Sequence, residues 1–373
     1  MPRSKSEKSN SVLSYIVGTL IPLAALAVFY LLSGNRDRME RICSGFSAPV
    51  LSFLGRAFSH IPVTAMELFI ILAVVCVIVF VWRLVSALLT GPRPRIFILI
   101  RYILVLAAIL AWVWNGYCWL WNTGYYGYSF AQKAGLESGG VSVSELYNAA
   151  EFFLDNANTL STQVSRDENG LFTGEFDDFA DDYESIFLPL EEEFPFLAGA
   201  STRPKGVYFS RIMSKTGFTG IYFFGETCIN TDQPDWGIPD TIAHELAHQH
   251  GVHLEAECNF LGIAACVQSS APSWRYSGYL SGLIHLMNAL YSADPDGWAE
   301  LRGRFSPGLE ADWLENSRYW QDAEGTVSKV TDKVYDTFLK INEQPSGLRS
   351  YGECVDILVL WLKTSSYSPM CGN

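Results

Sequence analysis

Three long apolar runs occupy the first third of the chain, at residues 12–32, 66–89 and 96–121. Each run is long enough to cross about 30 Å of hydrocarbon as a helix, and the third ends in tryptophans and tyrosines typical of a membrane interface. Arg3, Lys5 and Lys8 precede the first run, which could therefore also be a signal peptide. Since this run is long for a signal peptide and no clear cleavage site follows it, we interpret it as a membrane anchor.

Beyond residue 121 the polar and apolar positions mostly repeat with the period of a helix. This pattern predicts helices at 144–165, 176–197 (one helix or a pair), 241–250, 276–291, 311–320, 326–342 and 351–363, and one more after the histidine-rich segment. Two runs rich in aromatic and β-branched residues, 206–212 and 219–224, predict strands. The expected fold is mainly α with a small β element (α+β). A three-helix transmembrane region at 1–121 precedes a separate domain at 122–373.

The segment 244–248 reads His-Glu-Leu-Ala-His, the H-E-x-x-H spacing. On a helix, residues four apart share a face, so His244 and His248 can bind one Zn²⁺. The ion lowers the pKa of a water that it binds to about 7, and Glu245 is placed to act as general base and proton shuttle. The alternative is a solvated helix with incidental histidines. Asp240 as N-cap and Gly251 as helix stop favour the metal-binding helix.

A catalytic zinc needs a third protein ligand and one open position. The metzincin pattern has a glycine three residues and a histidine six residues after the second motif histidine, and it fits at Gly251 but fails at Leu254. Two glutamates remain, Glu255 and Glu257. We favour Glu255, because Asn259 lies one turn further on the same face and can orient a ligating histidine. Glu257 is then expected near the ligands without binding metal.

With this second element the chain resembles gluzincin-type metallopeptidases, in which E-x-x-A-D or E-x-x-A-N follows the H-E-x-x-H helix. Residues 255–259 read Glu-Ala-Glu-Cys-Asn, with Cys258 in place of the alanine. The whole chain is also similar to a family of uncharacterised bacterial membrane proteins with about three N-terminal spans. The shared segments are G-E-x-x-x-N at 225–230, H-E-L-A-H-Q at 244–249, E-x-E-x-N-F at 255–260 and R-Y-S-G-Y-L at 275–280. The resemblance implies a zinc peptidase domain and gives no substrate.

The same resemblance implies how a substrate binds. In gluzincin-type peptidases a strand before the metal helix offers its edge to an extended peptide, and 219–230 has that place here. Such pairing gives main-chain hydrogen bonds with little side-chain selectivity. We expect Glu226 and Asn230 to hold the substrate backbone or its terminus, with turn and capping chemistry as the alternative. Tyr276, with Arg275 behind it, is our candidate for a second donor to the oxyanion; otherwise it closes a helix pair.

The two parts of the chain that differ in hydropathy, 1–121 and 122–373, also differ in net charge. Residues 1–121 hold 11 basic and 4 acidic side chains, whereas 122–373 hold 15 and 35. The acidic part would repel phosphates, which excludes nucleic acid as a partner, and as a whole it would not lie flat on anionic lipid. The expected partners are a peptide or protein substrate and the lipid bilayer.

The basic N-terminus and the basic loop at 91–95 suit the cytoplasm, although four arginines at 36–56 oppose this orientation. We therefore expect a multi-pass protein of the bacterial cell membrane with an extracytoplasmic C-terminal domain.

Together these observations predict a membrane-anchored zinc-dependent metallopeptidase or amide hydrolase. One alternative is a non-catalytic sensor or receptor, stabilised by a closed zinc site that recruits His250, His253 or Cys258. The other is a membrane-assembly scaffold with a degenerate site and no metal. The intact Glu245 argues against a purely structural zinc site, which needs no general base.

Overall fold

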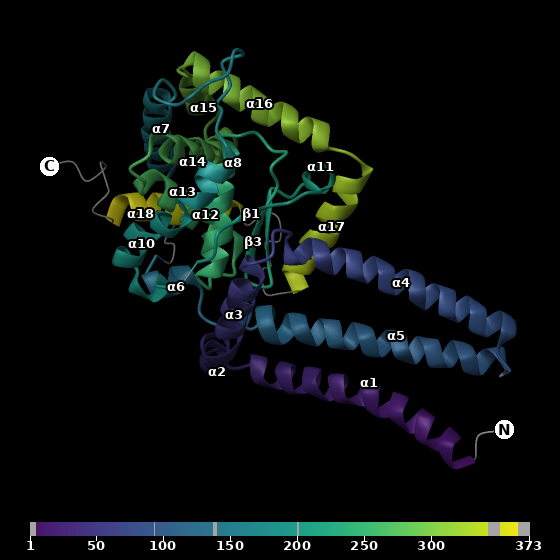
Figure 1. Ribbon diagram of the computed structural model, residues 1–373. Helices are drawn as coiled ribbons and strands as arrows, with labels where there is room; N and C mark the ends of the chain where they lie inside the picture. Colours follow the sequence, from purple (N-terminus) through teal and green to yellow (C-terminus); the bar gives the residue numbers. More distant parts are fainter. Residues whose placement is uncertain (1–4, 93, 137–139, 200, 342–350, 365–373) are drawn as a thin grey trace. The chain divides into compact units, whose positions relative to one another are not determined.

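The computed structural model describes residues 5–92, 94–136, 140–199, 201–341 and 351–364. The protein is mainly helical with a small three-stranded sheet, as the sequence predicts (Figure 1). It divides into two compact units. The first runs up to Leu51 and continues over Met66–Gly127, and the second comprises Ser52–Ala65 and Tyr128–Asn373. The second unit therefore includes a short segment that lies within the first third of the sequence.

The first unit is built from helices alone in its described residues. They are α1 (Lys5–Ser33), α2 (Arg36–Ile42), the π-helical turn η1 (Cys43–Ser47), the start of α3 (Ala48–Ser59), α4 (Ala65–Thr90), α5 (Arg95–Tyr117), the π-helical turn η2 (Cys118–Asn122) and η3 (Gly124–Tyr126). Helix α1 packs against α5, and Asn115 of α5 donates a hydrogen bond to the carbonyl of Pro22, 2.8 Å away. The buried ring of Phe29 meets Trp119 and Tyr126 edge to face, which closes this helix pair at one end.

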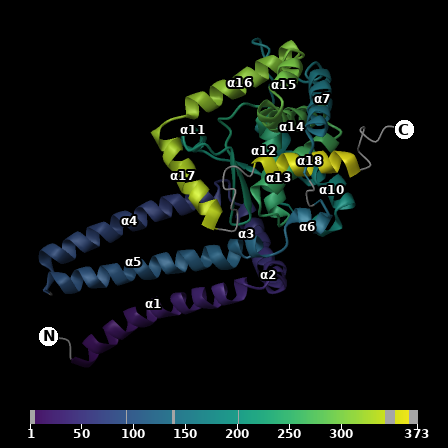
Figure 2. The ribbon, with the colours of Figure 1, turned by 180° about the vertical axis from the view of Figure 1, so that it is seen from behind.

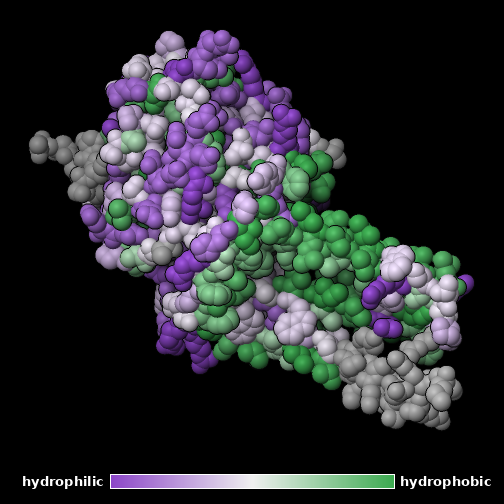
Figure 3. Space-filling view, viewed as in Figure 1, coloured by the Kyte–Doolittle hydropathy of each residue, from purple (hydrophilic) through white to green (hydrophobic). Residues whose placement is uncertain are grey.

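Among the described residues, two helices of this unit are long and apolar enough to cross a membrane, whereas the sequence predicts three. They are Ala65–Thr90 and the combined stretch Arg95–Asn122. Figure 3 shows the apolar surface that they present. The first predicted span lies on α1, and its apolar part among the described side chains is Val17–Ser33.

The second unit holds the remaining helices and the sheet. Its helices are α6 (Phe130–Ala134), α7 (Val143–Leu160), α8 (Phe176–Asp181), α9 (Tyr183–Ile186), α10 (Leu188–Glu193), η4 (Pro195–Leu197), α11 (Ser210–Ser214), α12 (Gly237–Gln249), α13 (Glu255–Gln268), α14 (Pro272–Ala293), α15 (Pro295–Arg302), α16 (Pro307–Ala323), α17 (Thr326–Ile341) and α18 (Tyr351–Thr364). Figure 2 shows them from behind.

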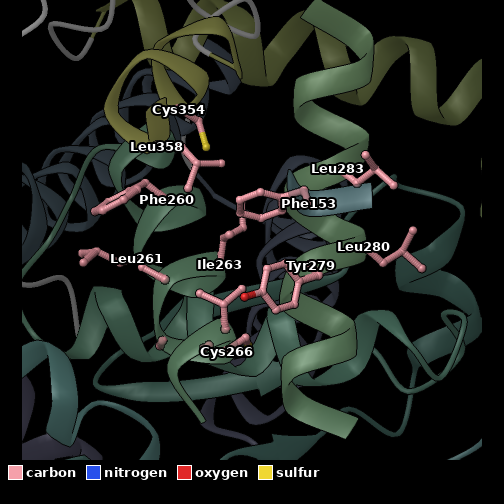
Figure 4. Close-up of a cluster of buried hydrophobic side chains, with 14 of the residues drawn as sticks. Phe153, Phe260, Leu261, Ile263, Cys266, Tyr279, Leu280, Leu283, Cys354 and Leu358 are labelled. Carbon is pink, nitrogen blue, oxygen red and sulfur yellow. The ribbon is translucent and has the colours of Figure 1, made fainter. Parts of the chain in front are cut away.

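Helix α13 lies at the centre of this unit and packs against α12, α14 and α18. It is apolar almost all round, as expected of a helix with neighbours on every side. Figure 4 shows Ile263 of α13 beside Phe153 of α7 and Tyr279 of α14, and the two rings lie 5.1 Å apart. This core holds the first turn of α13 rigidly against the end of α12.

The sheet has the order β1-β3-β2, with β1 (Lys205–Gly206) parallel and β2 (Gly220–Phe223) antiparallel to β3 (Glu226–Ile229). Strands β2 and β3 form a hairpin whose two turn residues, Phe224 and Gly225, both have positive φ. Turns of this kind match the twist of the paired strands. The strand order places β2 at one edge of the sheet. Strands β2 and β3 both pack against α12, the helix that carries the H-E-x-x-H motif.

Several predicted boundaries differ from the structure. The strand predicted at 206–212 ends at Gly206, because the chain turns where Ser210 donates to the carbonyl of Val207 and α11 begins. The helix predicted from Ser144 is capped by Ser142 in a capping box and ends at Leu160. The predicted helix at 176–197 is broken into α8, α9, α10 and η4. The motif helix begins at Gly237, so Asp240 lies inside it and is not its N-cap.

Candidate metal centre

The end of α12 and the start of α13 are joined by a tight reversal of the chain. Gly251 has a φ of 81°, the left-handed conformation that commonly ends helices, and its N–H donates to the carbonyl of His248. The N–H of Val252 donates to Ala247 in the same turn. Glu255 is the first residue of α13, so this reversal returns its side chain to the last two turns of α12.

The reversal brings His244, His248 and Glu255 together. Nε2 of His244 lies 3.3 Å from Oε2 of Glu255, and Nε2 of His248 lies 3.8 Å from Oε1. One ligand atom from each residue lies within 4.8 Å of the others. In a tetrahedral zinc site with bonds of about 2.0–2.1 Å, ligand atoms are about 3.3 Å apart. The two distances to Glu255 are close to this spacing, so the two nitrogens and one carboxylate suit a single zinc ion.

The tautomer of His248 suits this arrangement. Its Nδ1 lies 2.8 Å from the carbonyl oxygen of Val252, an atom that can only accept a hydrogen bond. The proton therefore sits on Nδ1, and Nε2 keeps the lone pair that a metal requires. Cys258 packs against the same Nδ1, with its sulfur 3.2 Å away. The sulfur thus lies on the side of the ring that faces away from Glu255.

The charges of the three side chains are strongly coupled. Burial opposes the protonation of His244, but the hydrogen bond to Glu255 and the nearby carboxylates raise its pKa to about 9. Burial acts against ionisation of Glu255, yet the two histidines lower its pKa to about 2. Burial lowers the pKa of His248 to about 4. The directions of these shifts favour an ion pair of His244 with Glu255 beside the neutral imidazole of His248.

Glu245 is buried next to this group, with 4% of its surface exposed. Its Oε2 has no hydrogen-bond partner among the described residues, and burial raises the pKa of the carboxyl to about 8. The other oxygen faces Gly220 on the edge strand β2, where a β-carbon would lie only 2.5 Å away. A buried carboxyl oxygen without a hydrogen bond costs free energy.

Tyr335 of α17 completes the surroundings of the group and was missed by the sequence analysis. Its hydroxyl donates to Oε1 of Glu255 at 2.8 Å, and its ring meets Phe218 edge to face. Tyr222 of β2 lies against the ring of His248. Eighty residues separate Tyr335 from Glu255, and no local pattern in α17 distinguishes this tyrosine. Only the packing of the two helices makes the contact visible.

The family described as "Protein of unknown function (DUF3810)" matches residues 44–359. The chain belongs to this family. The range matched to DUF3810 includes both apolar helices α4 and α5, the group His244, His248 and Glu255, and Tyr335. No curated protein matches the chain, and no solved structure does.

Two of the expected substrate residues have side chains engaged within the fold of this DUF3810 chain. Glu226 is buried, forms an ion pair with Lys205 and accepts a hydrogen bond from the backbone N–H of Ala65 at 2.5 Å. Asn230 is fully buried and donates to Ser214, the Phe218 carbonyl and Tyr319. Both side chains therefore hold parts of the fold together, which is closer to the turn and capping alternative than to contact with a substrate.

Tyr276 also lies elsewhere than expected. Its ring is fully buried, and its hydroxyl donates to Asp312 and accepts from Arg166. Asp312 in addition accepts from the backbone N–H of Phe172. We therefore assign Tyr276 to a buried network that ties α14 to α16.

The two residues expected beside the ligands differ from each other. Glu257 accepts hydrogen bonds from the backbone N–H groups of Phe130 and Ala131, both at 2.9 Å, and so caps α6. Asn259 is half-buried one turn after Glu255, and in the described part of the chain its side chain bonds to neither ligating histidine. The orienting partner of His248 is instead the Val252 carbonyl, which the turn delivers from the backbone.

Proposed function

We propose that this protein is a membrane-anchored zinc-dependent metallopeptidase or related amide hydrolase. The observation that carries the proposal is the group His244, His248 and Glu255 with the buried carboxyl of Glu245 beside it, whose Oε2 has no hydrogen-bond partner among the described residues. Two imidazoles and one carboxylate are a known ligand set of catalytic zinc, and three ligands leave one position open.

The chemistry divides between the ion and the chain. Bound zinc supplies an activated water and polarises the scissile carbonyl. Glu245 takes the proton of the attacking water and passes it to the leaving amine, which requires a carboxyl whose pKa lies near neutrality. Burial provides that condition, because it raises the pKa of Glu245 to about 8 in the metal-free protein. Tyr335 holds Glu255 in place through its hydroxyl and acts as a positioning residue.

The edge strand supports a peptide as the substrate. In the described part of the sheet, β2 pairs with β3 along one edge only. Gly220 of β2 faces Glu245, and Tyr222 lies against His248. An extended peptide added along this free edge gains main-chain hydrogen bonds while its backbone passes the metal-binding group. Sequence-independent pairing of this kind favours an amide substrate over a small, charged one.

The contacts of His250 and Cys258 bear on the sensor alternative. His250 stacks on Phe187 and contacts the Leu197 carbonyl and Ser201, at 2.7 and 2.9 Å. Cys258 lies behind His248, at Nδ1. Neither arrangement favours a closed four-ligand site, so an open site with a water position is the better proposal.

The two apolar helices α4 and α5 support membrane anchoring, and the charge pattern favours a bacterial cell membrane with the second unit on the extracytoplasmic side. Protease accessibility of the second unit in sealed vesicles of known orientation tests the sidedness. In right-side-out vesicles we expect external protease to digest the second unit. Digestion of this unit only after the vesicles are opened would place it on the cytoplasmic side.

The decisive experiment combines zinc content with hydrolysis for the full-length chain in detergent. We expect about one zinc per chain, lost in His244→Ala, and cleavage of a mixed peptide library read by mass spectrometry. Glu245→Gln should keep the zinc and lose the cleavage. Zinc without cleavage in the wild type would favour the sensor alternative, and a folded chain without zinc would favour the scaffold.

A further inference from the structure

Helix α17 carries an apolar stripe that faces solvent. Val327, Val330 and Val334 are 58%, 59% and 65% exposed, and their spacing places them on one face of the helix. Tyr335, about a quarter turn further round, points to Glu255 instead. The valine stripe is thus separate from the face through which α17 contacts the rest of its unit.

Helix α11 extends this apolar face. Tyr208, Phe209 and Ile212 are 72%, 46% and 66% exposed. Figures 1 and 2 show α11 and α17 side by side, and the segment that follows α11 packs on α17 through the Phe218–Tyr335 contact. We call these six apolar residues, which lie on α17, on α11 and in the two positions just before α11, the α11–α17 face. Exposed aromatic and aliphatic side chains gathered in this way mark an interaction surface.

Basic side chains are exposed beside the α11–α17 face, within a region 122–373 that is strongly acidic. Arg211 is almost fully exposed on α11, and Lys329 and Lys333 are exposed on α17. Arg211 forms an ion pair with Asp232 and Lys329 one with Glu324, each at 3.7 Å, and Asp332 is also exposed on α17. Lysine and arginine beside an apolar helix face suit lipid phosphates above a hydrocarbon layer.

Chain connectivity supplies the reason for a lipid partner. The backbone N–H of Ala65 is held by Glu226 in the second unit, and Ala65 is also the first residue of α4. Helix α4 is one of the two helices that can cross a membrane. If it does so, no linker separates the second unit from the bilayer surface, and a surface of that unit meets the headgroups at high effective concentration.

We infer that the α11–α17 face docks on the surface of the lipid bilayer, with the valines and aromatic rings in the interfacial layer and the basic side chains at the phosphates. The docked helix then separates lipid from Glu255 by about one helix diameter, 10–12 Å. Taken together with the proposed function, on which this step depends, the substrate class is peptide segments that lie close to the membrane surface.

The test uses the purified full-length chain in vesicles of phosphatidylcholine with phosphatidylglycerol. A benzophenone amino acid replaces Val330, and in a matched control it replaces Leu314, an exposed residue of α16. After illumination we expect lipid adducts from position 330 and none from position 314. Adducts to a second copy of the chain, equal lipid adducts from both positions, or no adduct from 330 would each overturn the inference.

The basic residues are tested in the same assay. Replacing Lys329→Gln and Lys333→Gln should lower the lipid adduct yield at 330 about fivefold for each lysine in anionic vesicles, since each basic residue near such a surface contributes about 1 kcal/mol. In vesicles of phosphatidylcholine alone the two changes should have little effect. An unchanged yield in anionic vesicles would remove the lysines from the docking surface. Cross-linking does not depend on hydrolysis, so it fails or succeeds independently of the proposed activity.

Discussion

Gly220 on β2 lies against Glu245 on α12 so closely that a β-carbon at position 220 would be 2.5 Å from Oε1 and 2.7 Å from Cγ of the glutamate. The φ of Gly220 is not in the left-handed region, so the backbone alone does not demand glycine there. Glycine is required there because the carboxyl of Glu245 occupies the space that a β-carbon would fill. Because residue 220 has no side chain, the edge strand β2 and the proposed general base Glu245 can pack directly against each other.

This relationship predicts the effect of Gly220→Ala. The added methyl group forces Glu245 or β2 to move, and overpacking of this kind costs about 1–3 kcal/mol. We expect zinc binding to persist, since neither histidine is touched, while hydrolysis falls sharply. Gly325→Ala is the matched control, because a β-carbon there meets nothing within 4 Å. Full activity in Gly220→Ala would show that the position of Glu245 does not matter for the reaction.

Substitutions of Glu255 and Glu257 on α13 should have different effects, one on zinc affinity and the other on the stability of the fold. Glu255→Gln removes a charged ligand and should weaken zinc binding by more than about 100-fold, the upper range for loss of a supporting partner. Glu257→Gln should keep zinc but lose about 2 kcal/mol of stability, because it weakens two buried charge-assisted hydrogen bonds to the N-terminus of α6. Zinc titration and thermal unfolding of both variants measure the two effects. Equal loss of zinc in both would contradict the assignment of Glu255 as the ligand.

Zinc should stabilise the protein more as the pH rises. The carboxylates around His244 overcome burial and raise its pKa from 6.5 to about 9, so this contribution to the metal-free fold is complete below 6.5 and is lost as pH rises through about 9. The raised pKa of Glu245, about 8, acts in the same direction. Zinc requires His244 without its proton, so its affinity increases over the same window.

The measurement is the Tm with and without zinc across that pH window. The difference should widen from the acidic to the alkaline end and should be absent in His244→Ala. Calorimetric titration in buffers of different ionisation enthalpy should in addition detect proton release on binding. A zinc-dependent shift in Tm that is independent of pH would contradict protonation of His244 in the metal-free state.

Tyr335→Phe tests the contact that the sequence did not reveal. Loss of one hydrogen bond to Glu255 is worth about 1 kcal/mol, which corresponds to about fivefold weaker zinc binding. Tyr276→Phe is the control, because its hydroxyl belongs to the Arg166–Asp312 network and its loss should lower stability without changing zinc affinity. If the two variants affect zinc equally, Tyr335 does not position the ligand.

The sequence predicted those features that depend on neighbours along the chain. Residues four apart on a helix share a face, so the spacing of His244 and His248 was enough to pair them. The mainly helical fold and the apolar helices α4 and α5 follow from local hydropathy in the same way. The preference for Glu255 over Glu257 agrees with the group that the fold brings together, although its stated reason, a partner at Asn259, is not the contact that the structure contains.

The tertiary structure decided the rest, because the deciding contacts join segments far apart in sequence. The reversal at Gly251 directs Glu255 toward the histidines and leaves Glu257 to cap α6. The fold brings Tyr335 of α17 to Glu255. The side chains of Tyr276, Glu226 and Asn230 form hydrogen bonds with residues that the local sequence pattern does not indicate. Residue type and spacing specify what chemistry a side chain can perform. Which partner it meets is set by how the helices pack, and that is a property of the whole core.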